Sequence, residues 1–235
     1  MNSRVIIALD FPSKVEVFQF LDQFQGEKLF VKVGMELFYR EGPSIIKEIQ
    51  ELGHQIFLDL KLHDIPNTVE SAMRNLGQLG VDMVNVHAAG GKEMMKAAKR
   101  GLLEGSKENG KTPLCIAVTQ LTSTSDDVLH NELLISKTME ETVVAYATMA
   151  KESGLDGVVC STLEVPSLHN ACGADFLAVT PGIRLESNKK DDQVRVATPE
   201  IAKKNGCQFI VVGRSITGAT NPVETYHTIN TTMEA

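Results

Sequence analysis

Residues 59–68 read "DLKLHDIPNT" and place three charged side chains, Asp59, Lys61 and Asp64, directly after an apolar run. Buried charge is costly unless it is paired or used. Asp59 and Lys61 are two residues apart, so on a strand they point to the same side. Carboxylates beside an ammonium keep the lysine protonated and aimed, and such a lysine can protonate a developing carbanion. Carboxylates can also repel an anionic substrate group and favour its loss, and the pattern does not choose between these roles.

Two more charged residues end the apolar runs that precede this one. Asp10 closes "IALD" and Lys32 lies in "VKVG". If these runs are neighbouring parallel strands, four charges of alternating sign face one small volume. The alternative is a salt-bridge network that only plugs the end of the sheet, since structural ion pairs also perturb titration. Four such residues on three consecutive strand ends favour the functional interpretation.

The last two apolar runs lead into segments suited to an anion. "VTPGIRL" contains Arg184, and "VVGRSITGATNP" contains Gly213 and Arg214. Gly213 lets backbone amides approach an anion, and Arg214 can bind its oxygens with two parallel hydrogen bonds. Arg184 and Gln193 lie at the two ends of a polar loop that could close over a phosphate. The alternative for Arg184 alone is a solvated surface arginine.

Several other polar residues carry weaker signals. Thr122 and Ser123 are small donors that could hydrogen-bond an oxygen-rich ring. Thr68, or Asn67 before it, is expected to cap the following helix, whatever else Thr68 does. His63 is expected to point away from Asp59 and Lys61, and His87 to be a lone histidine satisfied within the core.

The elements that must position these residues follow from a repeated pattern. Eight short runs rich in Val, Ile and Phe indicate strands covered on both faces, and amphipathic stretches between them indicate helices. Eight such alternations in 235 residues predict a single α/β domain, a (βα)8 TIM barrel over residues 1–235. The expected strands are 4–9, 28–34, 55–60, 83–88, 113–119, 157–161, 176–180 and 209–213, and the expected helices are 16–25, 42–53, 67–80, 93–105, 139–154 and 198–206.

Composition excludes several classes of function. The formal charge of −7 is spread along the chain without a basic block, so a nucleic-acid groove or a polybasic membrane patch is not expected. No signal peptide or membrane span is expected either. The six histidines lack HxH or HxxxH spacing, so we expect no metal site. The four cysteines are scattered in or beside apolar runs, which predicts core thiols and a cytoplasmic protein.

Taken together, these segments resemble the orotidine 5'-monophosphate decarboxylase family, in its bacterial form, over essentially the whole chain. "DLKLHDIPNT" is similar to that family's DxKxxDIPNT motif. "IALD", "VKVG", "TPGIR" and "VVGRSI" also stand where the family has them. The combination is highly specific, whereas DxKxxD alone is shared with sister barrels.

The resemblance implies decarboxylation of orotidine 5'-monophosphate to uridine 5'-monophosphate and CO2 in pyrimidine biosynthesis, without a cofactor or metal. It implies that Lys61 protonates the ring carbon left by CO2, with Asp59 and Lys32 in the same network. It also implies a homodimer in which Asp64 and Thr68 reach the neighbouring subunit's site. The remaining implied contacts are Asp10 and Lys32 to the ribose, Thr122 to the pyrimidine, Pro181 over the base, and Arg184, Gln193, Gly213 and Arg214 to the phosphate.

Two other interpretations remain open from the sequence. Sister phosphate-sugar barrels, such as 3-keto-gulonate 6-phosphate decarboxylase or hexulose phosphate synthase, share DxKxxD but use Mg²⁺ and an enediolate. "IPNT" after Asp64 disfavours them. A non-catalytic nucleotide-binding barrel is the second alternative, and the presence of both Asp59 and Lys61 disfavours it.

Overall fold

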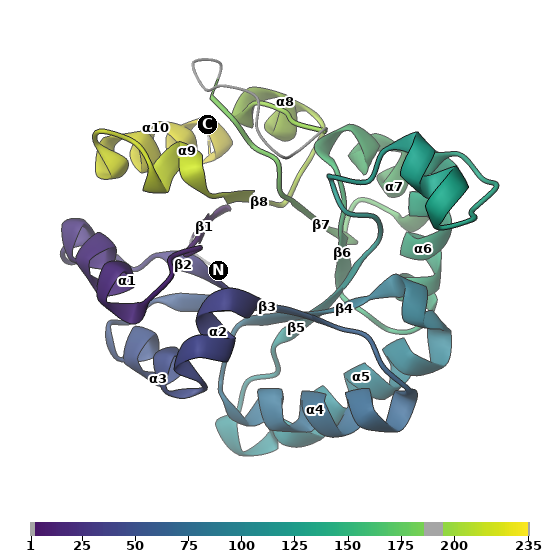
Figure 1. The fold of residues 1–235 in the computed structure, drawn as a ribbon, viewed down its shortest axis with the longest axis horizontal. Helices are drawn as coiled ribbons and strands as arrows, with labels where there is room; N and C mark the ends of the chain where they lie inside the picture. Colours follow the sequence, from purple (N-terminus) through teal and green to yellow (C-terminus); the bar gives the residue numbers. More distant parts are fainter. Residues whose placement is uncertain (1–2, 186–194, 235) are drawn as a thin grey trace.

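The computed structural model describes residues 3–185 and 195–234 and contains a closed barrel of eight parallel strands (Figure 1). Each strand pairs with the next along the chain, and β8 closes the barrel by pairing with β1. The predicted (βα)8 barrel is therefore confirmed. The strands are β1 Val5–Ala8, β2 Phe30–Gly34, β3 Gln55–Leu62, β4 Met83–His87, β5 Leu114–Val118, β6 Gly157–Val159, β7 Leu177–Thr180 and β8 Phe209–Val212.

Helices surround the strands as an outer ring (Figure 1). The six expected helices all form, although their ends differ by a few residues from the predicted ranges. The sequence analysis did not delimit α2, α7, α9 or α10, of which α2 and α9 are short. The helices are α1 Lys14–Leu21, α2 Met35–Glu41, α3 Ser44–Glu51, α4 Pro66–Gln78, α5 Gly91–Gly105, α6 Met139–Glu152, α7 Val165–Cys172, α8 Pro199–Lys204, α9 Arg214–Thr217 and α10 Pro222–Glu234.

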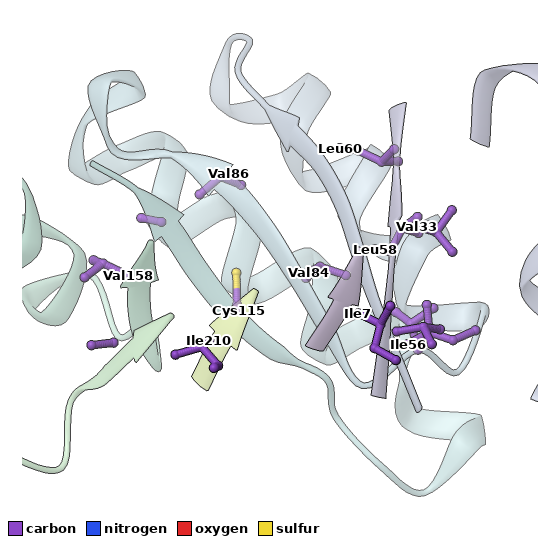
Figure 2. Close-up of a cluster of buried hydrophobic side chains, with 14 of the residues drawn as sticks. Ile7, Val33, Ile56, Leu58, Leu60, Val84, Val86, Cys115, Val158 and Ile210 are labelled. Atoms are coloured by element: carbon purple, nitrogen blue, oxygen red, sulfur yellow. The ribbon is translucent and has the colours of Figure 1, made fainter. Parts of the chain in front are cut away.

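Strand residues alternate between two apolar cores, as the period of two requires. One set lies against the helices, and Figure 2 shows part of it, including Ile7 on β1, Val33 on β2 and Ile210 on β8. The other set fills the barrel interior. Its members are Ile6, Ala8, Phe30, Phe57, Met83, Ile116, Val179, Phe209 and Val211. The side chains of Ala8, Phe30 and Phe57 point into the barrel. The residues two positions later along the chain, Asp10, Lys32 and Asp59, therefore also point inward, nearer the barrel mouth.

The helix that follows the charged strand end is held tightly against its neighbour. Helix α4 packs on α5 where two glycines of α5, Gly101 and Gly105, face the backbone of Glu70 and Arg74. A Cβ atom at either glycine would collide with a carbonyl oxygen of α4. These two glycines therefore allow a close helix–helix contact that fixes α4, whose first residues are the last three of the "DIPNT" segment.

The prediction that Asn67 or Thr68 caps α4 is wrong. The helix begins at Pro66, one residue before Asn67, and Ile65 occupies the N-cap position without a side-chain cap. Proline is favoured at the first helical position because its missing N–H would have no intrahelical partner there. Thr68 is thus already inside the first turn, where its side chain is exposed rather than engaged in capping.

The cysteines are core thiols, as predicted. Cys115, Cys160, Cys172 and Cys207 are all buried and free. Burial raises the pKa of the Cys115 thiol to about 12, so this thiol stays protonated at neutral pH. Among helices in the described ranges, none combines the length and apolar character needed to cross a membrane.

Candidate active site

The four charges predicted at the barrel mouth form one continuous network. Lys32 Nζ lies 2.9 Å from Asp10 Oδ1 and 3.4 Å from Asp59 Oδ2. Lys61 Nζ lies 2.7 Å from Asp59 Oδ1. The order along the network is therefore Asp10, Lys32, Asp59, Lys61, with signs that alternate at every step. Asp59 and Lys32 are buried, whereas the Asp10 side chain is 62% exposed.

The two central groups remain charged despite burial. Burial opposes the charge on Lys32, but the carboxylates of Asp59 and Asp10 outweigh it and raise the pKa of the ammonium. Burial also opposes the charge on Asp59, but the ammoniums of Lys32 and Lys61 outweigh it and lower the pKa of the carboxyl. An opposite charge within a few ångströms favours the ionised form. Lys32 and Asp59 are therefore both ionised at neutral pH.

Lys61 reaches Asp59 through a backbone conformation that simple alternation does not predict. Its φ is 52°, in the left-handed region, and the β3–β4 register shifts between Leu58 and Leu62. Asn85 on β4 holds this irregularity, because its Oδ1 accepts from Lys61 N at 2.8 Å and its Nδ2 donates to Asp59 Oδ1 at 2.6 Å. A left-handed lysine costs free energy and persists only where its surroundings fix it. Asn85 is 1% exposed and supplies that constraint.

Asn85 was not among the site residues predicted from the sequence. The available signal was a polar amide at an inward position of the run "MVNVH", between Met83 and His87. A buried amide requires hydrogen-bond partners, so its position predicts a polar neighbour on the adjacent strand. The identity of that neighbour depends on the register of β3 against β4, which the sequence does not give.

A cavity of about 550 Å³ opens above the network. Its floor is apolar and comes from inward residues of the strands, such as Phe57, Val118 and Val211. Such a cavity is in the usual size range for a small-molecule site. All its lining residues are Ala8, Asp10, Lys32, Phe57, Asp59, Lys61, Val118, Gln120, Leu121, Thr122, Ser123, Val159, Pro181, Gly182, Arg184, Val211, Gly213, Arg214 and Thr217.

Most of the predicted binding residues therefore meet in one cavity. Thr122 and Pro181 line it, as do Arg184, Gly213 and Arg214. The cavity also includes Gln120, Leu121, Gly182 and Thr217, which were not predicted and lie within a few residues of predicted site residues. Gln193 lies outside the described residues.

The segment that carries Arg184 is held by the chain that returns toward α8. Ile183 forms a short parallel bridge with Ala197. Arg184 N donates to Ala197 O at 2.9 Å, and Ala197 N donates to Gly182 O at 3.0 Å. These bonds fix the backbone of Arg184 at the cavity, next to Gly213 and Arg214 at the start of α9. Two guanidiniums in the wall of one cavity suit an anionic group.

Two residues of the "DIPNT" segment stand apart from this cavity. Within the described chain, neither Asp64 nor Thr68 belongs to the residues that line it. Both are exposed, and Asp64 Oδ1 accepts from Ile65 N at 2.7 Å. Ile65 between them is itself 66% exposed. An isolated chain therefore brings Asp59 and Lys61 into its cavity but leaves Asp64 and Thr68 on the surface.

The expectation that His87 is a lone histidine is wrong, whereas the orientation expected for His63 stays a prediction. The rings of His63 and His87 lie with centroids 5.7 Å apart, so His87 is not a lone histidine. Burial lowers the pKa of His87, and His63 and Lys61 add to this effect. The prediction for His63 assumed regular strand geometry, which ends at the left-handed Lys61. Across residues 3–185 and 195–234, no group of three or more His, Cys, Asp or Glu side chains is placed to hold a metal ion.

In chemical terms, the site offers an ammonium held beside the apolar floor of a cavity. The Lys61 ammonium, which can donate a proton, lies beside Asp59. The buried Lys32 lies on the other side of that carboxylate. An ammonium fixed in a low-dielectric pocket stabilises a neighbouring negative charge without solvent reorganisation. The arrangement can therefore stabilise and protonate a carbanion.

The sequence of this chain is similar to known proteins over nearly its full length. The model of the family described as "Orotidine 5'-phosphate decarboxylase / HUMPS family" matches residues 3–229. Proteins named orotidine 5'-phosphate decarboxylase from Bacillus cytotoxicus and Bacillus mycoides are each 64% identical over 234 residues, which covers 100% of this chain and 98% of theirs.

Two solved structures are similar over nearly the full length. Orotidine 5'-phosphate decarboxylase from Lactobacillus acidophilus superimposes with a TM-score of 0.90 at 47% identity and covers 100% of both chains. A protein from Geobacillus kaustophilus, described as an uncharacterized conserved protein, gives a TM-score of 0.88 at 53% identity and covers 97% of this chain and 99% of its own.

Proposed function

Because the chain belongs to the orotidine 5'-phosphate decarboxylase / HUMPS family, we propose that it decarboxylates orotidine 5'-monophosphate to uridine 5'-monophosphate and CO2 in pyrimidine biosynthesis. The observation that carries the proposal is the network from Asp10 through Lys32 and Asp59 to Lys61 at the edge of the cavity. The reaction uses no cofactor in this proposal. The single-domain organisation over residues 1–235 and a cytoplasmic location are parts of the same proposal.

Lys61 is the general acid in the proposed mechanism. The bond between the ring carbon and the carboxylate breaks, and its electron pair stays on the ring carbon as CO2 leaves. Lys61 Nζ then transfers a proton to that carbon and becomes a neutral amine, which solvent reprotonates. Asp59, 2.7 Å away, holds the Lys61 ammonium in place before the step. Preorganised charge of this kind stabilises the transition state more than the ground state.

The other cavity residues bind the nucleotide in this proposal. Asp10 and Lys32 hold the ribose hydroxyls, and Lys32 also supports Asp59. Thr122 contacts the pyrimidine, while Pro181 lies over the base. The phosphate is bound by Arg184, Gln193, Gly213 and Arg214. Binding energy from the phosphate, remote from the reacting carbon, helps to organise the charged site.

We further propose that the active unit is a homodimer. The exposed Asp64 and Thr68 reach the partner's cavity, where Asp64 completes the charged network and Thr68 contacts the nucleotide. The exposed Ile65 between them, together with Met35 and Tyr39 on α2, which are 44% and 71% exposed, supplies apolar surface for such a contact. Symmetric dimers are the commonest soluble oligomers and commonly bury such surface.

The contacts that the Asp59 carboxylate already makes disfavour a magnesium-dependent reaction. Its Oδ1 accepts from both Lys61 and Asn85, and its Oδ2 faces Lys32. A divalent cation would have to displace an ammonium from this carboxylate. Hard cations need several free oxygen ligands, which this arrangement does not offer at Asp59.

The proposal is tested by following the ultraviolet absorbance of orotidine 5'-monophosphate with purified protein, with and without a chelator. We expect rapid loss of substrate absorbance, uridine 5'-monophosphate as product and no effect of the chelator. Turnover abolished by the chelator would indicate a metal-dependent sister activity. Binding of the nucleotide without turnover would indicate a non-catalytic barrel.

Subunit sharing is tested by mixing two inactive variants, Lys61→Ala and Asp64→Ala. If each site uses Lys61 of one chain and Asp64 of the other, a mixed dimer contains one intact site and one doubly altered site. Random exchange of equal amounts then restores about a quarter of the wild-type activity per site, because half of the dimers are mixed. Mixtures that stay inactive after exchange would refute the shared site.

A further inference from the structure

A partly buried arginine outside the charged network joins two of the loops at the barrel mouth. The guanidinium of Arg195 forms an ion pair through Nη1 with Glu164, in the loop after β6. Its Nη2 donates to the carbonyl of Leu121, in the loop after β5, at 2.7 Å. The side chains of Arg195 and Glu164 are 15% and 8% exposed. None of the residues assigned above to catalysis or nucleotide binding makes these contacts.

Glu164 is itself held rigidly. It ends the short helical turn Thr162–Glu164, and its Oε2 accepts from Ser161 N at 2.8 Å in a capping box. Asn205, after α8, donates to the Thr162 carbonyl at 3.0 Å and fixes the same turn from the other side. The carboxylate that receives Arg195 is therefore positioned by backbone contacts that do not depend on the arginine.

The residues at the other end of the arginine line the cavity. Leu121 and Thr122 both belong to its wall. Besides the side-chain bond to Leu121, the backbone N–H of Arg195 donates to Thr122 O at 3.4 Å. Arg195 thus donates hydrogen bonds to two consecutive backbone carbonyls of the cavity wall. Two residues later, Ala197 O accepts from Arg184 N, so the same short segment also supports the phosphate end of the cavity.

The chemistry of this contact favours a positioning role. A buried ion pair seldom stabilises a fold more than well-packed apolar residues of similar volume would, so its net contribution to stability is a weak explanation for it. A guanidinium presents several donors in a fixed plane and can bind a carboxylate and a carbonyl at the same time, which a lysine ammonium does less rigidly. Errors of about 1 Å in substrate position can lower a rate about 100-fold.

We propose that Arg195, held by Glu164, is a positioning residue that fixes the Leu121–Thr122 wall against the pyrimidine end of the substrate. The inference rests on the proposed function, because Thr122 is the residue assigned there to the pyrimidine. Arg195 acts through the wall and does not itself touch the nucleotide.

The test is a double-mutant cycle in kcat/KM for orotidine 5'-monophosphate between Arg195→Met and Thr122→Ala. We expect Arg195→Met alone to lower kcat/KM about 10- to 100-fold, and Thr122→Ala alone also to lower it. In the Thr122→Ala background, Arg195→Met should lower kcat/KM less than about threefold, because the contact that it positions is already absent. Glu164→Gln, which retains an acceptor for Ser161, should give a smaller loss in the same direction and serves if Arg195→Met does not fold.

Lys99→Met is the matched control. Lys99 Nζ lies 2.6 Å from Asp156 Oδ2 in another partly buried ion pair, and Asp156 also accepts from Cys115 N at the start of β5, at the opposite end of the barrel. This variant should lower the melting temperature but leave kcat/KM within about twofold of wild type, since it removes an ion pair that does not touch the cavity wall.

Several outcomes would overturn the inference. It fails if the effects of Arg195→Met and Thr122→Ala multiply, if Thr122→Ala retains the wild-type kcat/KM, or if Arg195→Met changes kcat/KM no more than Lys99→Met. A wild-type protein that does not turn over orotidine 5'-monophosphate would instead refute the proposed function. The two failures are therefore distinguishable.

Discussion

Replacing Asn85 with leucine tests whether this residue holds Lys61 in its left-handed conformation. Leucine has a similar size and leaves little room for water, but it removes both hydrogen bonds of the amide. The carboxylate of Asp59 loses a donor at 2.6 Å, and the backbone N–H of Lys61 loses an acceptor at 2.8 Å. Asp59 keeps its contacts with Lys32 and Lys61, so the substitution removes the neutral amide and leaves all four charged residues of the network in place.

The magnitude follows from these two bonds. A hydrogen bond to a charged group contributes about 1.5–3 kcal/mol, and an unsatisfied buried N–H costs about 1–3 kcal/mol. We therefore expect Asn85→Leu to lower the free energy of unfolding by about 2.5–6 kcal/mol. Without its acceptor, the Lys61 backbone can relax, and a displaced ammonium is expected to lower kcat about 100-fold.

The assay combines urea unfolding with steady-state kinetics on orotidine 5'-monophosphate. Asn109→Ala is the control, since Asn109 donates one neutral hydrogen bond to Gly77 O at 2.8 Å, far from the cavity. It should cost about 1 kcal/mol of unfolding free energy and leave kcat unchanged. A kcat for Asn85→Leu within threefold of wild type, in a folded protein, would refute the argument that Asn85 positions Lys61.

Three further predictions concern the charged network and the phosphate end. Lys61→Ala should abolish turnover but largely spare binding of uridine 5'-monophosphate measured by calorimetry, and near-native turnover would exclude Lys61 as the general acid. Arg214→Ala should chiefly raise KM, because phosphate binding is lost, and an unchanged KM would contradict its role. Stability should also depend on pH at both extremes. The pKa of Asp59 is lowered from its ordinary 3.8, so its contribution is present above that value and is lost as the pH falls through the lower folded pKa. The pKa of Lys32 is raised from 10.5, so its contribution is present below that value and is lost as the pH rises through the higher folded pKa. Urea unfolding across pH should therefore show the stability difference between wild type and Asp59→Asn shrinking at acid pH, and a difference independent of pH would contradict this assignment.

The sequence by itself determined the barrel and the inward direction of most of the site. Eight apolar runs separated by helical patterns are sufficient for a (βα)8 fold, because each run is long enough for a buried strand and too short for a buried helix. Period-two alternation then places Asp10, Lys32 and Asp59 on the inner face, one step beyond the interior core. Such local periodicities are properties of neighbouring residues, so they can be read without knowing the fold.

Contacts between residues distant in sequence were decided only by the tertiary structure. The pairing of Asn85 with Asp59 and Lys61 depends on a register shift between β3 and β4 that no local pattern encodes. The left-handed backbone of Lys61 is likewise not encoded in any local pattern. The ion pair of Arg195 with Glu164 joins loops that meet only when the barrel closes.

The physical reason for this division is the range of the forces involved. Burial of apolar side chains repeats along each strand and helix, so the sequence records it at short spacing. Hydrogen bonds and ion pairs need their partners within about 3–4 Å, and strand register and loop closure decide which partners arrive there. The sequence therefore determined which side chains face the barrel mouth, and the closed barrel decided which of them hold one another in place.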